Sequence, residues 1–340
     1  IINNFDNLSF NKIIPENSYF KQLTSVNDHI LNLNDCNENL FFKGYKTYKI
    51  DDDNKTNVVE IKQIGDNTNL NVLGIFDEMF YESIKSLFNI TLCQNDINYR
   101  IPKNIDMFIV ESCWNGNNGD FKTVISWNKP ILKRLVHKCN KLNIPTVFIN
   151  KEDYINYDTF IHAAKLFDYV FTTDINCINK YKKDCPNAKG IYNLYFFVNI
   201  RSITQNSKYY EYNKEVLFAG SWLFRKHGSR NEDMIELYDE CLNNELQLNI
   251  IDRNSKTNTI NVYPNKYSNY LYHSVDYNDI IHYVNHKYEY ILNFNSVNNS
   301  ETMFARRIIE LLAQKKIVIS NYSPAINKYF KNLVFQKDDI

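Results

Sequence analysis

The sequence is poor in glycine and proline, with 8 and 7 of its 340 residues, and rich in asparagine. Runs of asparagine therefore need not mark turns. The sequence also lacks an excess of either charge, because 39 Lys and Arg residues balance 39 Asp and Glu residues. Without a basic excess there is no global field to attract nucleic acid or anionic lipid, so we expect neither as a partner.

No apolar run approaches the ~18 residues that a transmembrane helix needs, so no membrane span is expected. The 7 cysteines form no C-x-x-C motif and show no metal-like spacing with histidine, so we expect no bound metal and no resident cofactor. Their scattered, odd number is typical of reduced, mostly buried thiols in a cytoplasmic protein. The chain starts at Ile1 without an initiator Met or a signal peptide, which favours excision from a longer polypeptide.

A regular alternation of strands and helices begins near residue 70, after a polar, irregular segment over residues 1–68. We expect strands at 71–76, 105–112, 145–150 and 168–174, and helices at 80–88, 128–143 and 157–167. Residues 176–185 read as a short helix, and 190–197 lead out of this half. Strands that alternate with such helices imply βαβ units and a parallel sheet.

The same alternation restarts after a polar stretch near 200–213, which we interpret as a linker. Strands are expected at 215–222, 246–252, 288–295 and 316–320, with helices at 230–244 and from 301. The sequence thus predicts an α/β fold with two Rossmann-like domains, at 69–200 and 213–340. Two such domains place the carboxyl ends of both sheets across a shared central cleft.

The strand ends of the second half are rich in small and basic residues. Gly220 and Ser221 follow one strand, and a glycine there lets the backbone approach a ligand closely. Basic residues follow at Arg225 and Arg230, with a solvated loop as the alternative interpretation. Another strand ends in Arg253, and a third ends in Asn295 and Ser296.

The helix expected from residue 301 carries two adjacent arginines, Arg306 and Arg307. Ser300 is a natural N-cap, and a helix N-terminus offers free N–H groups to a phosphate. Thr302, Arg306 and Glu310 step by four and would line one helix face. We therefore expect amides and arginines on a diphosphate and Glu310 on ribose hydroxyls. The alternative is an Arg306–Glu310 pair that serves only stability.

The strand ends of the first half are acidic, at Asp77, Glu78, Glu111, Glu152, Asp153 and Asp174. Carboxylates that converge on one cleft can accept hydrogen bonds from sugar hydroxyls, or one can act as a base. For Asp77 and Asp174, capping of the following helix is an equal alternative. Glu111 lies in a Gly/Asn-rich loop that capping does not require. Trp114 in that loop reads as core or as a platform for a sugar ring.

Six motifs, in order, resemble the GT-B glycosyltransferases of the spore-maturation protein CgeB type. The resemblance runs from about residue 71 to about 330 and includes these stretches: GIFDEMFYE, VESCWNGNNGDF, IPTVFINKEDYINYDTFIHAAKLFDYVFTTD, LFAGSWLFRKHGSR, IIDR and LNFNSVNNSETMFARRIIELLA. Each motif is weak alone, and their order makes the match specific.

The resemblance implies that the second half binds a nucleotide-diphosphate sugar and the first half a hydroxyl acceptor. No metal is implied, because basic side chains neutralise the departing diphosphate. We expect a UDP-sugar as donor and a saccharide, cell-surface polysaccharide or glycoconjugate as acceptor. The expected catalytic residues are Glu111, Asp77, Glu78 and Arg306. The expected acceptor-binding residues are Trp114, Asn115, Glu152 and Asp153.

The sequence departs from the family pattern in three respects. Related retaining enzymes often carry two glutamates separated by seven residues; Glu310 matches the second, but Thr302 stands at the first position, which leaves retaining versus inverting chemistry open. Glu301 replaces a usual proline at the helix start, and Gln314 and Lys315 replace an expected glycine. These departures keep two alternatives: a catalytically silent sugar-binding module of a larger protein, and a sugar-nucleotide epimerase of the same fold.

Overall fold

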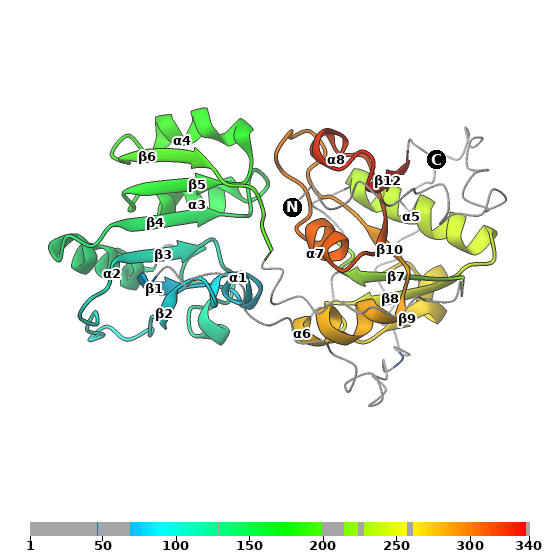
Figure 1. The fold of residues 1–340 in the computed structure, drawn as a ribbon, viewed down its shortest axis with the longest axis horizontal. Coiled ribbons are helices and arrows are strands. Elements are labelled where there is room, and N and C mark those ends of the chain that lie inside the picture. Colours follow the sequence, from blue (N-terminus) through cyan, green and yellow to red (C-terminus); the bar gives the residue numbers. More distant parts are fainter. Residues whose placement is uncertain are drawn as a thin grey trace.

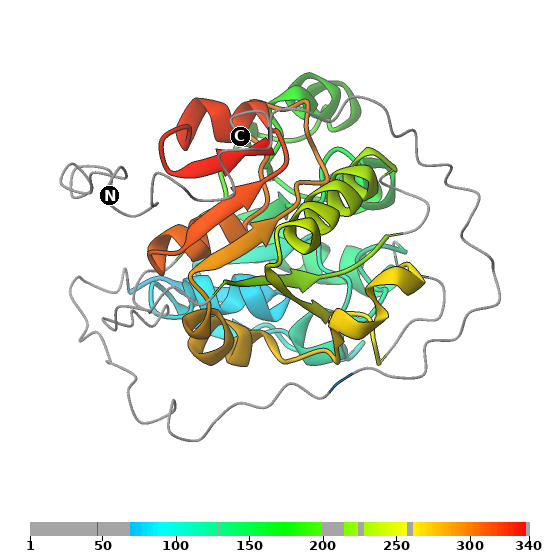
Figure 2. The same cartoon turned by 90° about the vertical axis from the view of Figure 1, so that its right-hand side faces the viewer.

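The computed structural model describes Lys46 and residues 69–127, 129–198, 214–223, 228–256 and 261–337. Two parallel sheets of six strands, each with helices on both faces, make up these residues (Figure 1, Figure 2). We refer to the residues around the first sheet, 69–198, as the first domain. Those around the second sheet, 214–337, are the second domain. The predicted α/β fold with two Rossmann-like domains is confirmed.

The first sheet has the strand order β2-β1-β3-β4-β5-β6. Its strands are β1 (Asn71–Ile75), β2 (Asn89–Leu92), β3 (Met107–Glu111), β4 (Thr146–Asn150), β5 (Tyr169–Thr172) and β6 (Gly190–Asn193). Its helices are α1 (Glu78–Ile84), α2 (Pro130–Lys141), α3 (Tyr157–Ala164) and α4 (Ile178–Asp184). Short 3₁₀ turns cover Asn117–Gly119 and Ile175–Cys177.

The second sheet has the strand order β12-β11-β10-β7-β8-β9. Its strands are β7 (Glu215–Gly220), β8 (Gln247–Asp252), β9 (Leu271–Tyr272), β10 (Tyr290–Asn293), β11 (Ile317–Ser320) and β12 (Val334–Gln336). Its helices are α5 (Gly228–Asn243), α6 (Tyr277–Asp279), α7 (Arg307–Ala313) and α8 (Pro324–Tyr329). A 3₁₀ helix (Asn265–Tyr270) precedes β9, and a π-helical turn (Ile280–Val284) and a 3₁₀ turn (Asn285–Lys287) follow α6.

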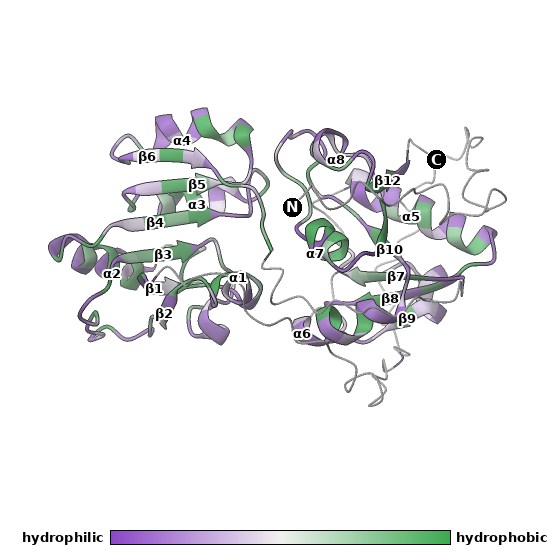
Figure 3. Ribbon diagram, viewed as in Figure 1, coloured by the Kyte–Doolittle hydropathy of each residue, from purple (hydrophilic) through white to green (hydrophobic). Residues whose placement is uncertain are grey.

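Each sheet has a hydrophobic core on both faces. In the first domain, α2, α3 and α4 cover one face through Leu132, Phe160 and Tyr181, while α1 covers the other through Phe80 and Ile84. In the second domain α5 packs on one face, and α7 and α8 pack on the other. The strands of both sheets are accordingly among the more hydrophobic segments (Figure 3). All six described cysteines are buried free thiols.

Strand order places one switch point in each sheet, where the direction of strand succession reverses. It lies between β1 and β3 in the first domain and between β7 and β10 in the second. In open parallel sheets, ligands bind outside the carboxyl ends of the strands at such a point. The two switch points are therefore the positions at which to look for a site.

The carboxyl ends of the two sheets face each other. The loop after β10 contacts the segment after β5, where Ser300 Oγ donates to Asp174 Oδ1 at 2.7 Å and Thr302 Oγ1 donates to the Thr173 carbonyl at 2.9 Å. It also reaches α1, which follows β1, because Arg306 donates to the Met79 carbonyl at 2.6 Å. In Figure 1 strands β3 to β6 point toward the second domain. This is the GT-B arrangement that the sequence predicts.

Candidate functional site at the facing strand ends

Three arginines gather at the switch point of the second sheet. Arg253 directly follows β8, Arg230 lies in the first turns of α5, and Arg307 is the first residue of α7. We call Arg230, Arg253 and Arg307 the arginine cluster. Its members come from separate elements, so their approach depends on the fold rather than on sequence proximity.

Ser221, directly after β7, links two members of the cluster. Arg230 Nη1 donates to the Ser221 carbonyl at 3.1 Å, and Arg253 Nε donates to Ser221 Oγ at 3.1 Å. Arg230 Nε also donates to the Phe294 carbonyl at 3.4 Å, after β10. Arg230 is thus held by backbone carbonyls on both sides of the switch point, after β7 and after β10.

Arg307 lies over an aromatic ring in the same place. Its guanidinium carbon is 5.3 Å from the centre of the Phe218 ring, a cation–π geometry. The ring rests against Gly220, where an added Cβ would lie 2.4 Å from Phe218. Glycine at the end of β7 therefore keeps Phe218 beneath Arg307.

The arginine cluster has no compensating ion pair within the part of the chain that the structure describes. Burial, together with repulsion from Arg253 and Arg230, outweighs attraction from Glu310 and lowers the pKa of Arg307 to about 10. Burial likewise lowers the pKa of Arg230. Arg230 is buried, Arg307 is half-buried and Arg253 is exposed, so the cluster opens to solvent at Arg253. Like charges held together this way stabilise a bound anion.

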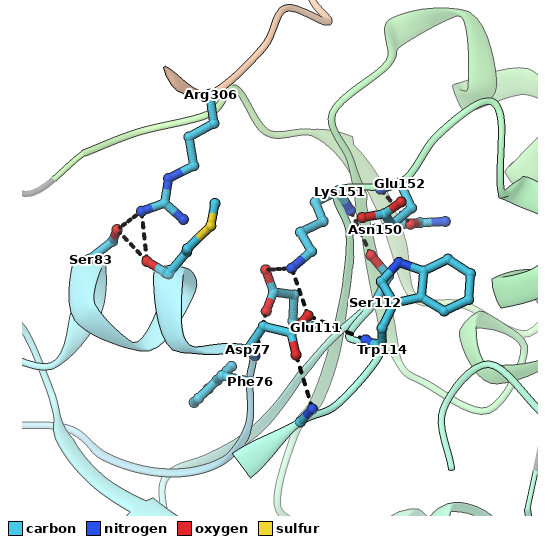
Figure 4. Close-up of polar contacts among 12 residues, drawn as sticks. Phe76, Asp77, Ser83, Glu111, Ser112, Trp114, Asn150, Lys151, Glu152 and Arg306 are labelled. Atoms are coloured by element: carbon cyan, nitrogen blue, oxygen red, sulfur yellow. Dashed lines mark hydrogen bonds and ion pairs between the residues drawn. The ribbon is translucent and has the colours of Figure 1, made fainter. Parts of the chain in front are cut away.

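A second polar group lies at the switch point of the first sheet (Figure 4). Lys151 Nζ, directly after β4, is 3.0 Å from Asp77 Oδ2 and 3.0 Å from Glu111 Oε1. The Asp77 amide donates to Glu111 Oε2 at 2.9 Å. We call Asp77, Glu111 and Lys151 the lysine–carboxylate cluster. The sequence predicted the two acidic members and missed Lys151, whose only signal was its place directly after a strand.

The electrostatics of the lysine–carboxylate cluster favour a structural role for Glu111 and Lys151. Burial raises the pKa of Glu111, which is fully buried, although Lys151 opposes the shift. For Asp77, burial acts upward, but Lys151 and backbone N–H groups outweigh it, so its pKa is lowered. Burial acts to lower the pKa of Lys151, but the two carboxylates raise it overall. Glu111 is therefore sealed from an acceptor, contrary to the prediction that it faces one.

Asp77 organises the glycine-rich loop rather than capping α1. It occupies the N-cap position without a side-chain cap hydrogen bond. Its carboxylate instead accepts from the amides of Trp114 at 3.2 Å, Asn115 at 3.3 Å and Gly116 at 2.9 Å. Gly116 has φ +54°, which a side chain rarely tolerates. Asp174, by contrast, caps the 3₁₀ turn by accepting from Asn176 N at 3.0 Å.

The predicted acceptor residues fall into two groups. Trp114, with 38% of its surface exposed, packs edge-on against Phe160 with ring centres 5.2 Å apart, and Asn115 beside it is exposed. Glu152, partly exposed, accepts from Asn156 Nδ2 at 2.9 Å. Asp153 is buried behind the strand ends, so its predicted contact with an acceptor is wrong.

Glu78, the first residue of α1, is the exposed carboxylate of the predicted catalytic set. It accepts from Asn278 Nδ2 of the second domain at 3.0 Å. Burial and the neighbouring Glu82 and Asp276 raise its pKa. A carboxylate with a raised pKa that faces the other domain is suited to accept a proton.

The helix expected from residue 301 begins instead at Arg307. Ser300 Oγ accepts from the amides of Thr302 at 3.3 Å and Met303 at 3.1 Å, and the Ala305 amide donates to Asn295 Oδ1 at 2.8 Å. These bonds hold residues 301–306 in a turn. Ser300 and Thr302 are buried against the first domain. The predicted phosphate site at a helix N-terminus with a Ser300 cap is therefore wrong.

Arg306 contacts the first domain and Glu310 rather than the arginine cluster. The Arg306 guanidinium donates to the Met79 carbonyl and to Ser83 Oγ of α1 (Figure 4) and lies 3.0 Å from Glu310 Oε1. Glu310 also accepts from the Tyr277 hydroxyl at 2.7 Å. The predicted phosphate contact of Arg306 and ribose contact of Glu310 are not supported. The alternative of an Arg306–Glu310 pair is observed.

The remaining residues that were predicted to bind the nucleotide sugar are not part of the arginine cluster. Asn295 is buried, and its amide group bonds to Ser320 and Asn321. Ser296 is exposed at the surface. Arg225 lies outside the described residues. Of the predicted nucleotide-sugar residues, the structure thus brings together Gly220, Ser221, Arg230, Arg253 and Arg307.

Within the described ranges, no three His, Cys, Asp or Glu side chains are grouped so that they could hold a metal ion. None of the helices in those ranges is both long enough and apolar enough for a membrane span.

No protein-family model matches the chain, and no curated protein matches it, so the resemblance to the CgeB type stays a prediction. Solved structures with a similar fold include Anabaena Alr3699/HepE with UDP and glucose (10% identity, TM-score 0.39, 76% of this chain and 83% of that chain). The same protein with UDP-glucose gives 10% identity and a TM-score of 0.40 over 79% and 85% of the chains. An alpha1,3-fucosyltransferase gives 13% identity and a TM-score of 0.37 over 78% of this chain and 73% of that chain. Similarity at this level does not carry function from those proteins to this chain.

Proposed function

We propose that this protein is a glycosyltransferase that moves a sugar from a nucleotide-diphosphate donor to a hydroxyl acceptor. The observation that carries the proposal is the arginine cluster, which has no ion pair among the described residues and lies at the switch point of the second sheet. The cluster matches a diphosphate, because guanidinium groups bind phosphate oxygens in a fixed fork geometry.

In the reaction, the bond between the anomeric carbon and the diphosphate oxygen breaks, and its electron pair stays on that oxygen. Arg230, Arg253 and Arg307 would stabilise the charge that develops there without a metal ion. Loss of one such preorganised donor typically costs about 100-fold or more in rate. The acceptor oxygen forms the new bond to the anomeric carbon and loses its proton to a base.

Glu78 is the group that we assign as this base. It faces the second domain, is exposed and has a raised pKa. Asp77 and Glu111 would act indirectly, since they hold the loop at Trp114–Gly116 that forms the acceptor side. The exposed part of Trp114 offers an apolar face to a sugar ring.

The decisive experiment measures calorimetric binding of UDP, GDP, CDP and dTDP to the wild type, Arg253→Ala and Lys266→Ala, with and without EDTA. We expect UDP to bind in the presence of EDTA, and Arg253→Ala to weaken binding by about tenfold or more, because a charge-assisted hydrogen bond is lost. Lys266 is the matched control, as it is an exposed cation of the second domain that pairs with Asp239 away from the cluster. Uridine without phosphates should bind far more weakly than UDP.

Failure of every diphosphate to bind, or equal binding by Arg253→Ala and the wild type, would contradict the proposal. A second candidate is a catalytically silent sugar-binding module. It is favoured by one observation: Glu111 is sealed and Asp77 is occupied by Lys151 and three amides. That candidate predicts saccharide binding without UDP binding. An epimerase would convert the donor sugar without any acceptor, which product analysis detects.

A further inference from the structure

Arg306 and its partners form a closed ring of contacts between the two domains. Arg306, from the second domain, donates to the Met79 carbonyl and to Ser83 Oγ on α1 of the first. It pairs with Glu310, which accepts from the Tyr277 hydroxyl at 2.7 Å. The next residue, Asn278, returns to α1 by donating to Glu78. The ring thus contacts α1 at three points, Glu78, Met79 and Ser83.

On each domain, the ring lies next in sequence to a cluster of the candidate site. Arg307, the next residue after Arg306, belongs to the arginine cluster. Asp77, the N-cap of α1, belongs to the lysine–carboxylate cluster, and Glu78 is the first residue of the helix. A shift of α1 relative to Arg306 would therefore change the separation of the two clusters. The Arg306–Glu310 pair within the ring is shielded from solvent, since the Arg306 side chain is 10% exposed and that of Glu310 is 4% exposed.

We infer that Arg306 is a positioning residue, which holds α1, and with it Asp77 and Glu78, in fixed register with the arginine cluster. Its meaning for catalysis rests on the proposed function, while the contact itself does not. Arg306 acts through α1 and touches neither the diphosphate nor the acceptor. Alignment of reacting groups is sensitive to small displacements, so this contact would affect turnover rather than donor affinity.

The test compares amide hydrogen exchange of α1 and of the loop after β3 in the wild type, Arg306→Ala and Ser83→Ala, without ligand. Ser83→Ala removes one of the two partners of Arg306 in the first domain and leaves the Met79 carbonyl, α7 and the arginine cluster intact; alanine is also a good helix former. We expect exchange in α1 to accelerate by about tenfold or more in Arg306→Ala, because hydrogen bonds to a charged group are lost. Ser83→Ala should shift the same peptides in the same direction, and Arg306→Lys should restore part of the protection.

UDP affinity, measured on the same variants, separates this inference from the proposed function. We expect Arg306→Ala and Ser83→Ala to bind UDP within about twofold of the wild type, whereas Arg253→Ala weakens binding by about tenfold or more. Unchanged exchange in α1, or a change confined to α7, would overturn the positioning role. A loss of UDP affinity in Arg306→Ala as large as in Arg253→Ala would overturn it too, since Arg306 would then be a donor ligand. If the wild type binds none of the four diphosphates, the proposed function fails and the exchange data still decide the contact.

Discussion

Ser300 and Asp174 are 126 positions apart in sequence and joined by a 2.7 Å hydrogen bond between buried side chains of different domains. The same Ser300 oxygen accepts from the amides of Thr302 and Met303. Ser300→Ala would leave Asp174 short of a donor and release the turn. We expect a loss of about 1.5–3 kcal/mol in the free energy of unfolding, measured with urea, because a buried hydrogen bond to a carboxylate is removed. Ser296→Ala, at an exposed position of the same loop, should stay within about 0.5 kcal/mol of the wild type.

Lys151→Met should destabilise the first domain strongly. It removes the only cation that contacts the fully buried Glu111 within the described residues. Loss of one partner of a buried ion pair typically costs about 3–5 kcal/mol, because the remaining charge is uncompensated. Lys189→Met is the control, since Lys189 is an exposed lysine that pairs with Asp168. Equal losses in the free energy of unfolding for the two variants, measured with urea, would show that the Lys151 ion pair contributes no more than a surface ion pair.

Arg307→Met should separate stability from binding. The variant removes a charge whose pKa burial and neighbouring arginines lower to about 10, so the ligand-free protein should gain up to about 1 kcal/mol in stability. UDP affinity should fall by about tenfold or more, as a charge-assisted contact is lost. Thermal unfolding with and without UDP measures both effects. A destabilised variant with normal UDP affinity would mean that Arg307 is structural.

The burial of Asp153 should make the free energy of unfolding fall as pH rises. Burial raises its pKa to about 7, against the donation of hydrogen bonds from Thr172 and Tyr181. The folded chain therefore retains a proton that the unfolded chain releases above about pH 4, and the free energy of unfolding should fall by up to about 1.4 kcal/mol per pH unit until about pH 7. Above that pH this contribution is constant.

Asp153→Asn should remove this slope while keeping the shape of the side chain. Its amide oxygen can accept from Asn150 and Tyr181, and its NH₂ group can donate to the Thr172 hydroxyl, which has the Asp174 carbonyl as another acceptor at 3.2 Å. Urea unfolding at several pH values checks the outcome. Parallel pH profiles for the variant and the wild type would assign the slope to other groups.

The sequence predicts the long elements of this fold well, because their signals are local. Helix α2 has a proline at its first position and an apolar stripe that ends in lysines, and it forms over Pro130–Lys141 within the expected 128–143. Short edge strands carry too little pattern: β9 has 2 residues and β12 has 3, and neither was predicted. Their pairing depends on neighbours that sequence periodicity does not reveal.

The site was predicted in part, and the error over the helix expected from residue 301 has an identifiable physical cause. We expected carboxylates to converge at the strand ends of the first half and basic residues at those of the second. Asp77 and Glu111 lie together in the first domain, and Arg253 and Arg307 lie together in the second. The apolar spacing after residue 301 looked helical, but the side chains of Ser300 and Asn295, just before it in the same loop, accept hydrogen bonds from its amides. These bonds turned Arg306 toward the first domain. Local periodicity cannot register competition of this kind.

Lys46 precedes the whole first domain in sequence, yet its backbone pairs with β9 of the second domain. Its amide donates to the Leu271 carbonyl at 3.1 Å, and its carbonyl accepts from the His273 amide at 2.8 Å. One residue from before the first domain thus pairs with the edge strand of the second domain. A fragment that begins at residue 214 would lose these pairings and present β9 as an open sheet edge, which favours aggregation.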